Sequence, residues 1–455
     1  MAMLLAFLSS IYYVKVLSSS GYGNIATIQA IMVYITLIVL YGLQTYGTRE
    51  ISKNKDSINL IAGNIILFRI IVLLISYVAI FLVAFIFVSE YEFKWLIIFY
   101  ALTLLPAAIN LDWVFIGMQK MHYNAVYNII RNLLPFVLSV IFIKKNSGIY
   151  LIPVFVFVGL ALGLIYQLFV FYKKEKLKLK PVLKIETIHK YLLLGGPFLF
   201  SGILATINLN SDRLVISFTI SKTAAAIYAV AYLIISFLMN VVVMIFTPVV
   251  PSFIALFHNN KLRELSILAD KVAKIIILAV FPLVVGGILL SKDIISLFKK
   301  EYATASTPFA ILLIYILILF MRELYGYGLN AWNMEKEYLK IVIISSIVNL
   351  VGNLLFTPTY GMNAAAIITV FSEVINFVLM KKQGQKIIRV SYKTYVVKIM
   401  PSIFLMILFV ALLKYNNINV IINIIVAMIV YIIAVFMTKY VTLKEIRGFL
   451  QLKSR

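Results

Sequence analysis

The sequence has 455 residues, 63% of them hydrophobic and 13% charged, and it carries a formal net charge of +24. This composition lies far outside the range of soluble domains and predicts a polytopic membrane protein. Apolar runs long enough to cross a hydrocarbon core as helices recur along the whole chain. The strands of a membrane β-barrel would be about 10 residues long and would alternate in polarity, so that class is excluded.

We predict an all-α fold with about fourteen transmembrane helices. In chain order, the predicted spans are residues 2–17, 24–46, 62–88, 93–117, 123–143, 149–172, 192–218, 223–256, 268–290, 306–330, 338–357, 362–382, 396–414 and 418–440. The first span is short, and no basic flank precedes it. A signal peptide is the alternative for this segment, but it has neither a charged amino-terminal region nor a small-residue cleavage site. We therefore expect the natural start to lie upstream and the first span to be truncated.

Similar sequences recur in the two halves of the chain. Residues 21–35 (GYGNIATIQAIMVYI) and 224–237 (AAAIYAVAYLIISF) occupy the same place relative to a span, and residues 117–134 and 333–351 each join two spans. This repeat predicts two six-helix lobes that enter the membrane from the same side. The expected organisation is an N-terminal lobe at 1–175, a basic cytoplasmic linker at 176–190, a C-terminal lobe at 191–385, and two additional spans with a basic tail at 386–455.

Lysine and arginine are concentrated in alternate loops. The loops after even-numbered spans include ISKNKD at 51–56, KKEKLKLKPVLK at 173–184 and KKQGQKIIR at 381–389, whereas the other loops contain few basic residues. Because short basic loops stay in the cytoplasm, this asymmetry predicts that both termini are cytoplasmic. The positive charge is then mostly a topology signal that also attracts anionic lipid. A nucleic-acid partner is not expected, since no soluble domain exists to bind one.

Catalytic and metal-binding signatures are missing from the sequence. It contains no GxxxxGK[ST], HExxH or GxSxG motif, no cysteine, and three scattered histidines, His122, His189 and His258. A membrane polymerase or ligase usually needs a sizeable external loop with acids or bases, and no predicted external loop exceeds about fifteen residues. We predict a protein that is not an enzyme and has no metal and no cofactor.

Ionisable residues inside the predicted spans are the candidate functional residues, because a charge within a membrane is costly and is normally functional. In the first lobe, Arg69, Arg131 and Asp112 share one depth, about 8 to 12 Å from the ends of their spans. We expect a buried network in which Asp112 holds one arginine while the other keeps an unmet charge.

Further charged residues lie inside other spans. Arg322 and Glu323 are at a comparable depth in the second lobe, Glu373 is near the middle of its span, and Lys15, Asp212 and Arg213 are nearer the external side. Snorkelling to the interface is the alternative for the basic side chains. The acids are either ion-paired structural residues or proton or cation sites.

The pair formed by Asp212 and Arg213 needs a separate explanation. Adjacent residues on a helix point about 100° apart, so at least one of the two must face a partner helix or a wet cavity. A positively charged cavity between the two lobes would bind phosphate or an acidic sugar more strongly than the same cations would in water, so we predict an anionic substrate.

Three segments carry a family resemblance. They are LDWVFIGMQKMHYNAVYNIIRN at 111–132, which contains a D-W-x-F-x-G-x-x-K-M-x-Y pattern, VLSSSGYGNIATIQAI at 16–31 with TREISKN at 48–54, and NSDRLVISF at 210–218 followed by AAAIYAVAYLI at 224–234. These segments resemble the Wzx-type O-antigen and polysaccharide flippases of the multidrug/oligosaccharidyl-lipid/polysaccharide exporter superfamily. The resemblance extends to about residue 385.

The resemblance implies two six-helix lobes that form a V around a central cavity, with two extra helices. It also implies a flippase that moves undecaprenyl-diphosphate-linked oligosaccharide units across the bacterial cytoplasmic membrane by alternating access, for assembly of O-antigen or of capsular or exopolysaccharide. The expected substrate-binding cations are Arg213, Arg69, Arg131, Arg322 and Lys15, and the expected orienting or coupling acids are Asp212, Asp112, Glu323 and Glu373.

Other expectations follow from the same resemblance. Transport would be coupled to a proton or sodium gradient, and the partners would include membrane lipids, a polysaccharide polymerase and a chain-length regulator. A flippase for lipid II or another lipid-linked precursor remains an alternative. A drug/cation antiporter would favour an acidic cavity, and a membrane polymerase or ligase would need an external catalytic loop.

Overall fold

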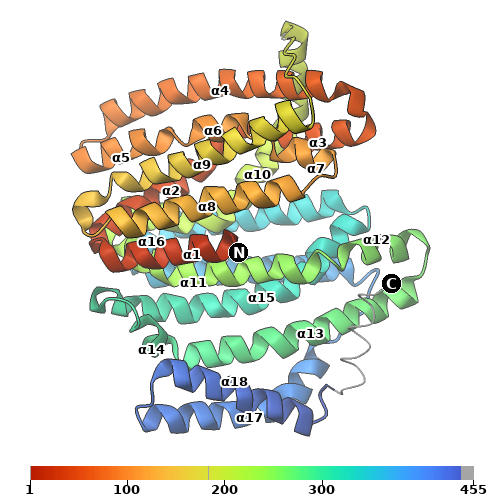
Figure 1. The fold of residues 1–455 in the computed structure, drawn as a ribbon. Coiled ribbons are helices and arrows are strands. Elements are labelled where there is room, and N and C mark those ends of the chain that lie inside the picture. Colours follow the sequence, from red (N-terminus) through yellow and green to blue (C-terminus); the bar gives the residue numbers. More distant parts are fainter. Residues whose placement is uncertain (1, 183, 442–455) are drawn as a thin grey trace. The chain divides into compact units, whose positions relative to one another are not determined.

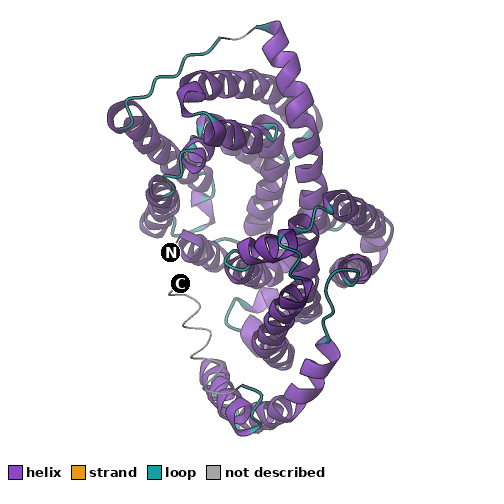
Figure 2. Cartoon of the chain, turned by 90° about the vertical axis from the view of Figure 1, so that its right-hand side faces the viewer, coloured by secondary structure: helices purple, strands orange, loops and turns teal. Residues whose placement is uncertain are grey.

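The computed structural model describes residues 2–182 and 184–441, and in these ranges it contains helices and no strand (Figures 1 and 2). This confirms the predicted all-α fold. Twelve helical segments of the described chain are long and apolar enough to cross a membrane, and residues 3–16 form a shorter apolar helix. The chain divides into two compact units, Met1–Ala229 and Val230–Arg455.

The first unit contains helices α1 to α10 and the start of α11. Their bounds are Ala2–Val16 (α1), Ser19–Leu40 (α2), Leu43–Lys53 (α3), Ile58–Phe87 (α4), Tyr91–Ala101 (α5), Leu104–Ile109 (α6), Asp112–Gly117 (α7), His122–Phe142 (α8), Leu151–Phe169 (α9), Ile185–Thr219 (α10) and Lys222–Phe246 (α11). Short turns of 3-10 helix lie at Lys55–Ser57 (η1) and Asn146–Gly148 (η2), and a π-helical turn, Val170–Lys174 (η3), extends α9.

The second predicted span is not one continuous helix. Helix α2 begins earlier than expected because Ser18 caps it, its Oγ accepting a hydrogen bond of 3.1 Å from the backbone N–H of Gly21. The helix ends at Leu40, where Tyr41 and Gly42 both have positive φ, 53° and 67°. This left-handed turn separates α2 from the amphipathic helix α3.

The fourth predicted span, 93–117, is also broken. It consists of three short helices, α5, α6 and α7, and the second break lies at Asn110 and Leu111. A break inside a membrane leaves backbone polar groups without their helical partners, so side chains must satisfy them. This requirement places polar residues at the break, and they form part of the candidate site described below.

Residues from the start of the motif segment 111–132 form the apolar core between α3 and α7. Trp113 and Phe115 pack with Leu43 and Ile51 of α3. The backbone of Gly47 in α3 packs directly against the Trp113 indole, because a Cβ at this position would come within 2.2 Å of the ring. Close packing of this kind holds α7 in place beside the break.

The second unit contains the rest of α11 and helices α12 to α18. Their bounds are Val250–His258 (α12), Leu262–Leu289 (α13), Ser291–Ile295 (α14), Ser306–Ala331 (α15), Glu335–Gly384 (α16), Tyr392–Tyr415 (α17) and Val420–Met437 (α18), with a 3-10 turn at Lys300–Ala305 (η4). Helix α15 packs along α16, and α17 packs against α18 and α13. The adjacent α17 and α18 are the blue helices of Figure 1.

Two long segments of this unit contain internal breaks. Helix α16 combines two helices that meet at Gly361, whose φ of 75° and ψ of −166° are not helical. The predicted spans 338–357 and 362–382 lie on either side of this glycine. The predicted span 223–256 is divided into α11 and α12, where Pro248 lies between the helices and Pro251 is at the start of α12.

Candidate functional site

A cavity of about 680 Å³ lies inside the first unit. Helices α1, α2, α3, α4 and α6 to α9 all contribute residues to its wall. Arg69, Asp112 and Arg131 are all among the lining residues. The structure therefore brings together the three charged residues that the sequence places at one depth in the first lobe.

Arg69 is the most deeply buried cation of this group. Its relative exposure is 1%, and its Nη2 donates a hydrogen bond of 3.2 Å to Oε1 of Gln44. Its guanidinium carbon lies 5.6 Å from the centroid of the Trp113 ring. Its Nε has no hydrogen-bond partner among the described residues. The positive charge is thus supported by a neutral amide and an aromatic face rather than by a carboxylate.

Arg131 lies on α8 and is exposed to the cavity. Its guanidinium carbon is 5.6 Å from the centroid of the Tyr127 ring, and Tyr127 also lines the cavity. With two arginines and one aspartate in its wall, the cavity has an excess of positive charge. Such a surface favours anionic ligands, and the attraction is stronger where bulk water is excluded.

Asp112 is the first residue of α7 and lies directly after the helix break. Its backbone N–H donates to Oδ1 of Asn110 (2.8 Å), and its Oδ1 accepts a hydrogen bond of 2.6 Å from Nε2 of Gln167. In the described part of the chain, no arginine comes within the 4.0 Å ion-pair distance of this carboxylate. The expected pairing between Asp112 and an arginine is therefore replaced by an amide contact.

Gln167 is a site residue that the sequence argument missed. It lies on α9, is completely buried, and its Oε1 accepts a hydrogen bond of 3.0 Å from the backbone N–H of Leu111. One side chain therefore satisfies both a backbone donor freed by the break and the carboxylate of Asp112. The available signal was a single glutamine inside the apolar run LALGLIYQLFV.

Asp212 and Arg213 lie on α10 in the same unit, but neither lines this cavity. Asp212 is 2% exposed, and its Oδ2 accepts a hydrogen bond of 2.5 Å from the hydroxyl of Tyr228. Its Oδ1 accepts from the backbone N–H of Arg213 at 2.8 Å, and the Arg213 guanidinium donates to Oδ1 of Asn210. Neighbouring protein groups thus solvate this carboxylate inside the helix bundle.

Lys15 stands apart from the other candidates. It is exposed in the last turn of α1 and does not line the cavity. A cation in this position interacts favourably with the carboxyl end of the helix. Its location fits the snorkelling alternative given above.

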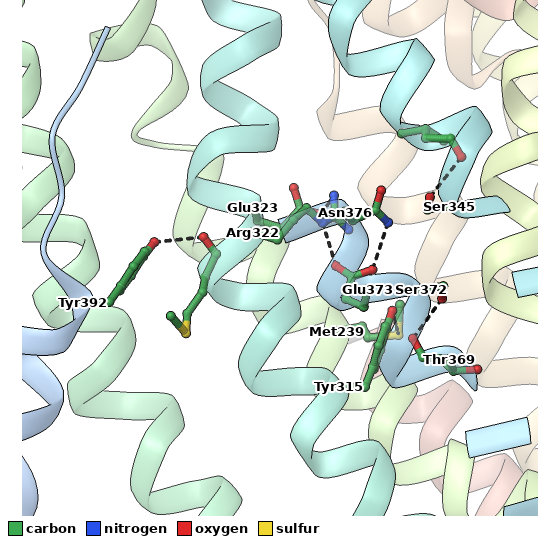
Figure 3. A network of polar contacts seen from close by, with 12 residues as sticks. Met239, Tyr315, Arg322, Glu323, Ser345, Thr369, Ser372, Glu373, Asn376 and Tyr392 are labelled. Carbon is green, nitrogen blue, oxygen red and sulfur yellow. Dashed lines mark hydrogen bonds and ion pairs between the residues drawn. The ribbon is translucent and has the colours of Figure 1, made fainter. Parts of the chain in front are cut away.

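The remaining candidates form one cluster in the second unit. Arg322 of α15 makes ion pairs of 3.0 Å with Glu323 and 2.7 Å with Glu373, and Asn376 donates a hydrogen bond of 3.2 Å to Oε2 of Glu373 (Figure 3). The side chains of Arg322 and Glu373 are 11% and 6% exposed. Two carboxylates therefore surround one guanidinium, so this cluster has an excess of negative charge.

A second group of polar residues missed by the sequence argument joins the two halves of α16. Asn349 donates to Ser372 at 3.2 Å across the break, and Asn353 donates to the backbone carbonyl of Asn349 at 3.0 Å. All three side chains are buried. Within the described residues, no group of three or more His, Asp or Glu side chains is arranged to hold a metal ion.

Comparisons with known proteins agree with this architecture. The chain is 27% identical over 140 residues to a putative O-antigen transporter of Shigella dysenteriae and 30% identical over 154 residues to one of Escherichia coli (strain K12). These matches cover 30% and 32% of the chain but only 35% and 36% of the relatives, so about a third of each relative is matched. The inward closed conformation of the lipid II flippase MurJ has a TM-score of 0.80, with 16% identity and 95% of each chain covered, which shows a shared fold.

The family assignment covers a longer stretch of the sequence. Residues 1–257, which include the whole first unit and the cavity, match the family described as polysaccharide biosynthesis protein. This confirms the resemblance found in the segments 16–31, 111–132 and 210–218. The chain belongs to this polysaccharide biosynthesis family of multi-pass membrane proteins.

Proposed function

We propose that this protein is a flippase for lipid-linked oligosaccharides. Its substrate would be an undecaprenyl-diphosphate-linked repeat unit, moved by alternating access across a bacterial cytoplasmic membrane for O-antigen, capsular or exopolysaccharide assembly. Membership of the polysaccharide biosynthesis family supports this proposal, as do the relatives described as O-antigen transporters. Both termini would be cytoplasmic, in accordance with the distribution of lysine and arginine.

The observation that carries the proposal is that Arg69, in the cavity wall, is a buried charge without a carboxylate partner among the described residues. A guanidinium cannot lose its proton, so a buried one retains its charge. Burying a charge away from water costs roughly several kcal/mol unless a counter-charge compensates for it. Arg69 is 1% exposed, and within residues 2–182 and 184–441 it contacts no carboxylate. An anionic ligand in the cavity would supply the missing counter-charge, and a diphosphate has the oxygen acceptors that an arginine binds best.

The size of the cavity suits the polar part of such a substrate. A volume of about 680 Å³ lies within the range typical of small-molecule sites. It is appropriate for a diphosphate with adjoining sugar, whereas a long lipid tail would remain outside. Arg69 and Arg131 would hold the anion, and Asp112, fixed by Gln167, would accept hydrogen bonds from sugar hydroxyl groups.

The two units would have different tasks in this proposal. The cluster of Arg322, Glu323 and Glu373 already balances its arginine with two acids, so it suits coupling to a proton or sodium gradient better than anion binding. Arg213 would contribute positive charge outside the cavity, whereas Lys15, exposed at the end of α1, would snorkel to the membrane interface and take no part in binding. No cofactor would be required, and a polysaccharide polymerase and a chain-length regulator would use the translocated product.

Complementation tests this proposal. The chain would be expressed in a strain that lacks its own polysaccharide flippase and produces the sugar unit of the native gene cluster. We expect the wild type to restore surface polysaccharide, Arg69→Gln to fail, and Lys15→Gln, the control outside the cavity, to restore it normally. All variants would be compared at equal membrane abundance and equal thermal stability in detergent. Full activity of both Arg69→Gln and Arg131→Gln would refute the cationic site.

A parallel strain separates the proposed substrate from the lipid II alternative. In cells depleted of their lipid II flippase, we expect the wild-type chain not to restore growth. Rescue of growth there, without rescue of surface polysaccharide in the first strain, would replace the proposed substrate with lipid II.

A further inference from the structure

The segment between η3 and α10 carries lysines that face away from the protein. In 176–180, Lys176, Lys178 and Lys180 are exposed, whereas Leu177 and Leu179 pack against the core that includes α3, α4 and α7. Over 177–180 this alternation is that of an extended chain with one buried face, in which alternate residues are about 6.6 Å apart, whereas Lys176 has a φ of 53° and lies in the turn that leads into it. We call Lys176, Lys178 and Lys180 the lysine strip.

The backbone of the strip is fixed to the beginning of α4. The backbone N–H of Lys178 donates to Oδ1 of Asn59 at 2.9 Å, and that of Lys180 donates to the carbonyl of Asn59 at 3.1 Å. The backbone N–H of Val182 donates to Oδ1 of Asn64 at 2.6 Å. Gly63 permits this approach, because a Cβ there would lie 2.7 Å from the carbonyl carbon of Lys180. The strip is therefore held in place rather than left as a mobile loop.

Glu175, the acidic residue that directly precedes the strip, is already bound by other residues. Glu175 forms an ion pair with Lys120 and accepts a hydrogen bond of 3.0 Å from the hydroxyl of Tyr123. Burial alone would raise the pKa of Glu175, but the hydrogen bonds from Lys120 and Tyr123 outweigh it and lower the pKa. The carboxylate is thus ionised and bound to groups at the start of α8, so it does not neutralise the strip.

The strip lies where two membrane spans end. Asn59 and Asn64 are in the first two turns of the span Ile58–Phe87, and the span Leu151–Lys174 ends two residues before Lys176. Fixed cations at this level are within reach of lipid headgroups, where each lysine near an anionic surface contributes about 1 kcal/mol. A soluble acidic protein would instead have to approach a narrow strip beside the membrane.

We propose that the lysine strip is a preformed binding site for anionic phospholipid headgroups at the membrane surface. The basis is geometric: three outward lysines alternate with two inward leucines, and their backbone is hydrogen-bonded to the end of a span. This proposal does not depend on the transported substrate, because the strip is separate from the lining of the cavity.

Native mass spectrometry of the full chain in detergent tests this proposal. The wild type would be mixed with equal amounts of phosphatidylglycerol and phosphatidylcholine. We expect preferential retention of phosphatidylglycerol, and a loss of about a hundredfold in that preference for the triple variant Lys176→Gln, Lys178→Gln, Lys180→Gln, given roughly fivefold per lysine. Replacement of the same lysines by arginine should preserve the preference, and high salt should abolish it.

A matched control separates a site from net charge. The variant Lys271→Gln, Lys382→Gln, Lys393→Gln removes the same charge from exposed positions in the second unit and should retain the lipid like the wild type. Equal losses in the two triple variants, or no loss in either, would overturn the proposal. Removal of the Asn59 side-chain contact by Asn59→Ala should speed hydrogen exchange at the Lys178 amide while all lysines remain. Unchanged exchange there would overturn the claim that the strip is preformed.

Discussion

Gln167 of α9 donates a hydrogen bond of 2.6 Å to the carboxylate of Asp112 across the break between α6 and α7. The same side chain accepts from the backbone of Leu111. A buried amide thus fixes both the course of the broken span and the orientation of an acid in the cavity wall. The contact links the local requirement for satisfied backbone groups to the geometry of the proposed binding site.

Replacing Gln167 by leucine should destabilise the protein and impair transport. The change leaves the half-buried carboxylate of Asp112 and the buried backbone N–H of Leu111 without their partner, at a cost of about 1 to 3 kcal/mol for a group that stays unsatisfied. The thermal midpoint in detergent, followed by tryptophan fluorescence, should fall. Leu162→Ala, at an exposed position of the same helix, should change it little. A midpoint unchanged by Gln167→Leu would show that the break does not depend on this amide.

Arg69→Gln should weaken anion binding by the purified protein. Inorganic diphosphate is a suitable probe, and its affinity can be measured by titration calorimetry. Loss of charge-assisted hydrogen bonds worth about 1.5 to 3 kcal/mol predicts a decrease of roughly ten- to a hundredfold. Arg69→Lys should restore only part of the affinity, because an ammonium cannot reproduce the planar fork beside Gln44 and Trp113. Equal affinity in Arg69→Gln and wild type would place the anion elsewhere.

Gly47→Ala should disturb the indole that lies beside Arg69. The added methyl group would come within 2.2 Å of the Trp113 ring, and such overpacking typically costs about 1 to 3 kcal/mol. Gly196 of α10 is a matched control, since a Cβ there meets no atom within 4 Å. Thermal unfolding should show a lower midpoint for Gly47→Ala and an equal or higher one for Gly196→Ala. The same result for both glycines would contradict the packing described for α3 and α7.

Glu373→Gln should destabilise the second unit, because it removes one partner of a buried ion pair. The expected loss is about 3 kcal/mol, the lower end for broken buried pairs, since Glu323 still contacts Arg322. In a double-mutant cycle, Arg322→Gln combined with Glu373→Gln should cost less than the two single changes added together. Strict additivity in thermal unfolding would mean that the pair is not energetically coupled.

The pH dependence of stability should reveal the ion pair at Glu175. Its pKa is lowered in the folded protein, because hydrogen bonds from Lys120 and Tyr123 outweigh burial. Its contribution is therefore complete above the ordinary glutamate pKa of 4.5 and disappears as the pH falls through the lowered value. The difference in thermal midpoint between wild type and Glu175→Gln should be constant near neutral pH and shrink in acid. A difference that grows on acidification would have the wrong sign.

The sequence alone was sufficient for the membrane class, the all-helical fold and the family. These properties depend on features that need no partner: apolar runs of sufficient length, and the motif at 111–132. It also placed Arg69, Arg131 and Asp112 at one depth, because the rise of a helix per residue is constant. The cavity that these three residues line agrees with that placement.

The contacts of each charge were decided only by the tertiary structure. Depth along a helix says nothing about which way a side chain points, so the sequence could not tell which of Lys15, Arg69 and Arg131 face a cavity. Packing buries Arg69 against Gln44 and Trp113 and leaves Lys15 exposed. It also places the carboxylate of Asp112 in a hydrogen bond with Gln167 rather than in an ion pair with an arginine. The breaks after Leu40 and Ile109 were equally hidden, because apolarity continues through them while the backbone leaves the helix. Partners distant in the chain determine these features, and only folding brings those partners together.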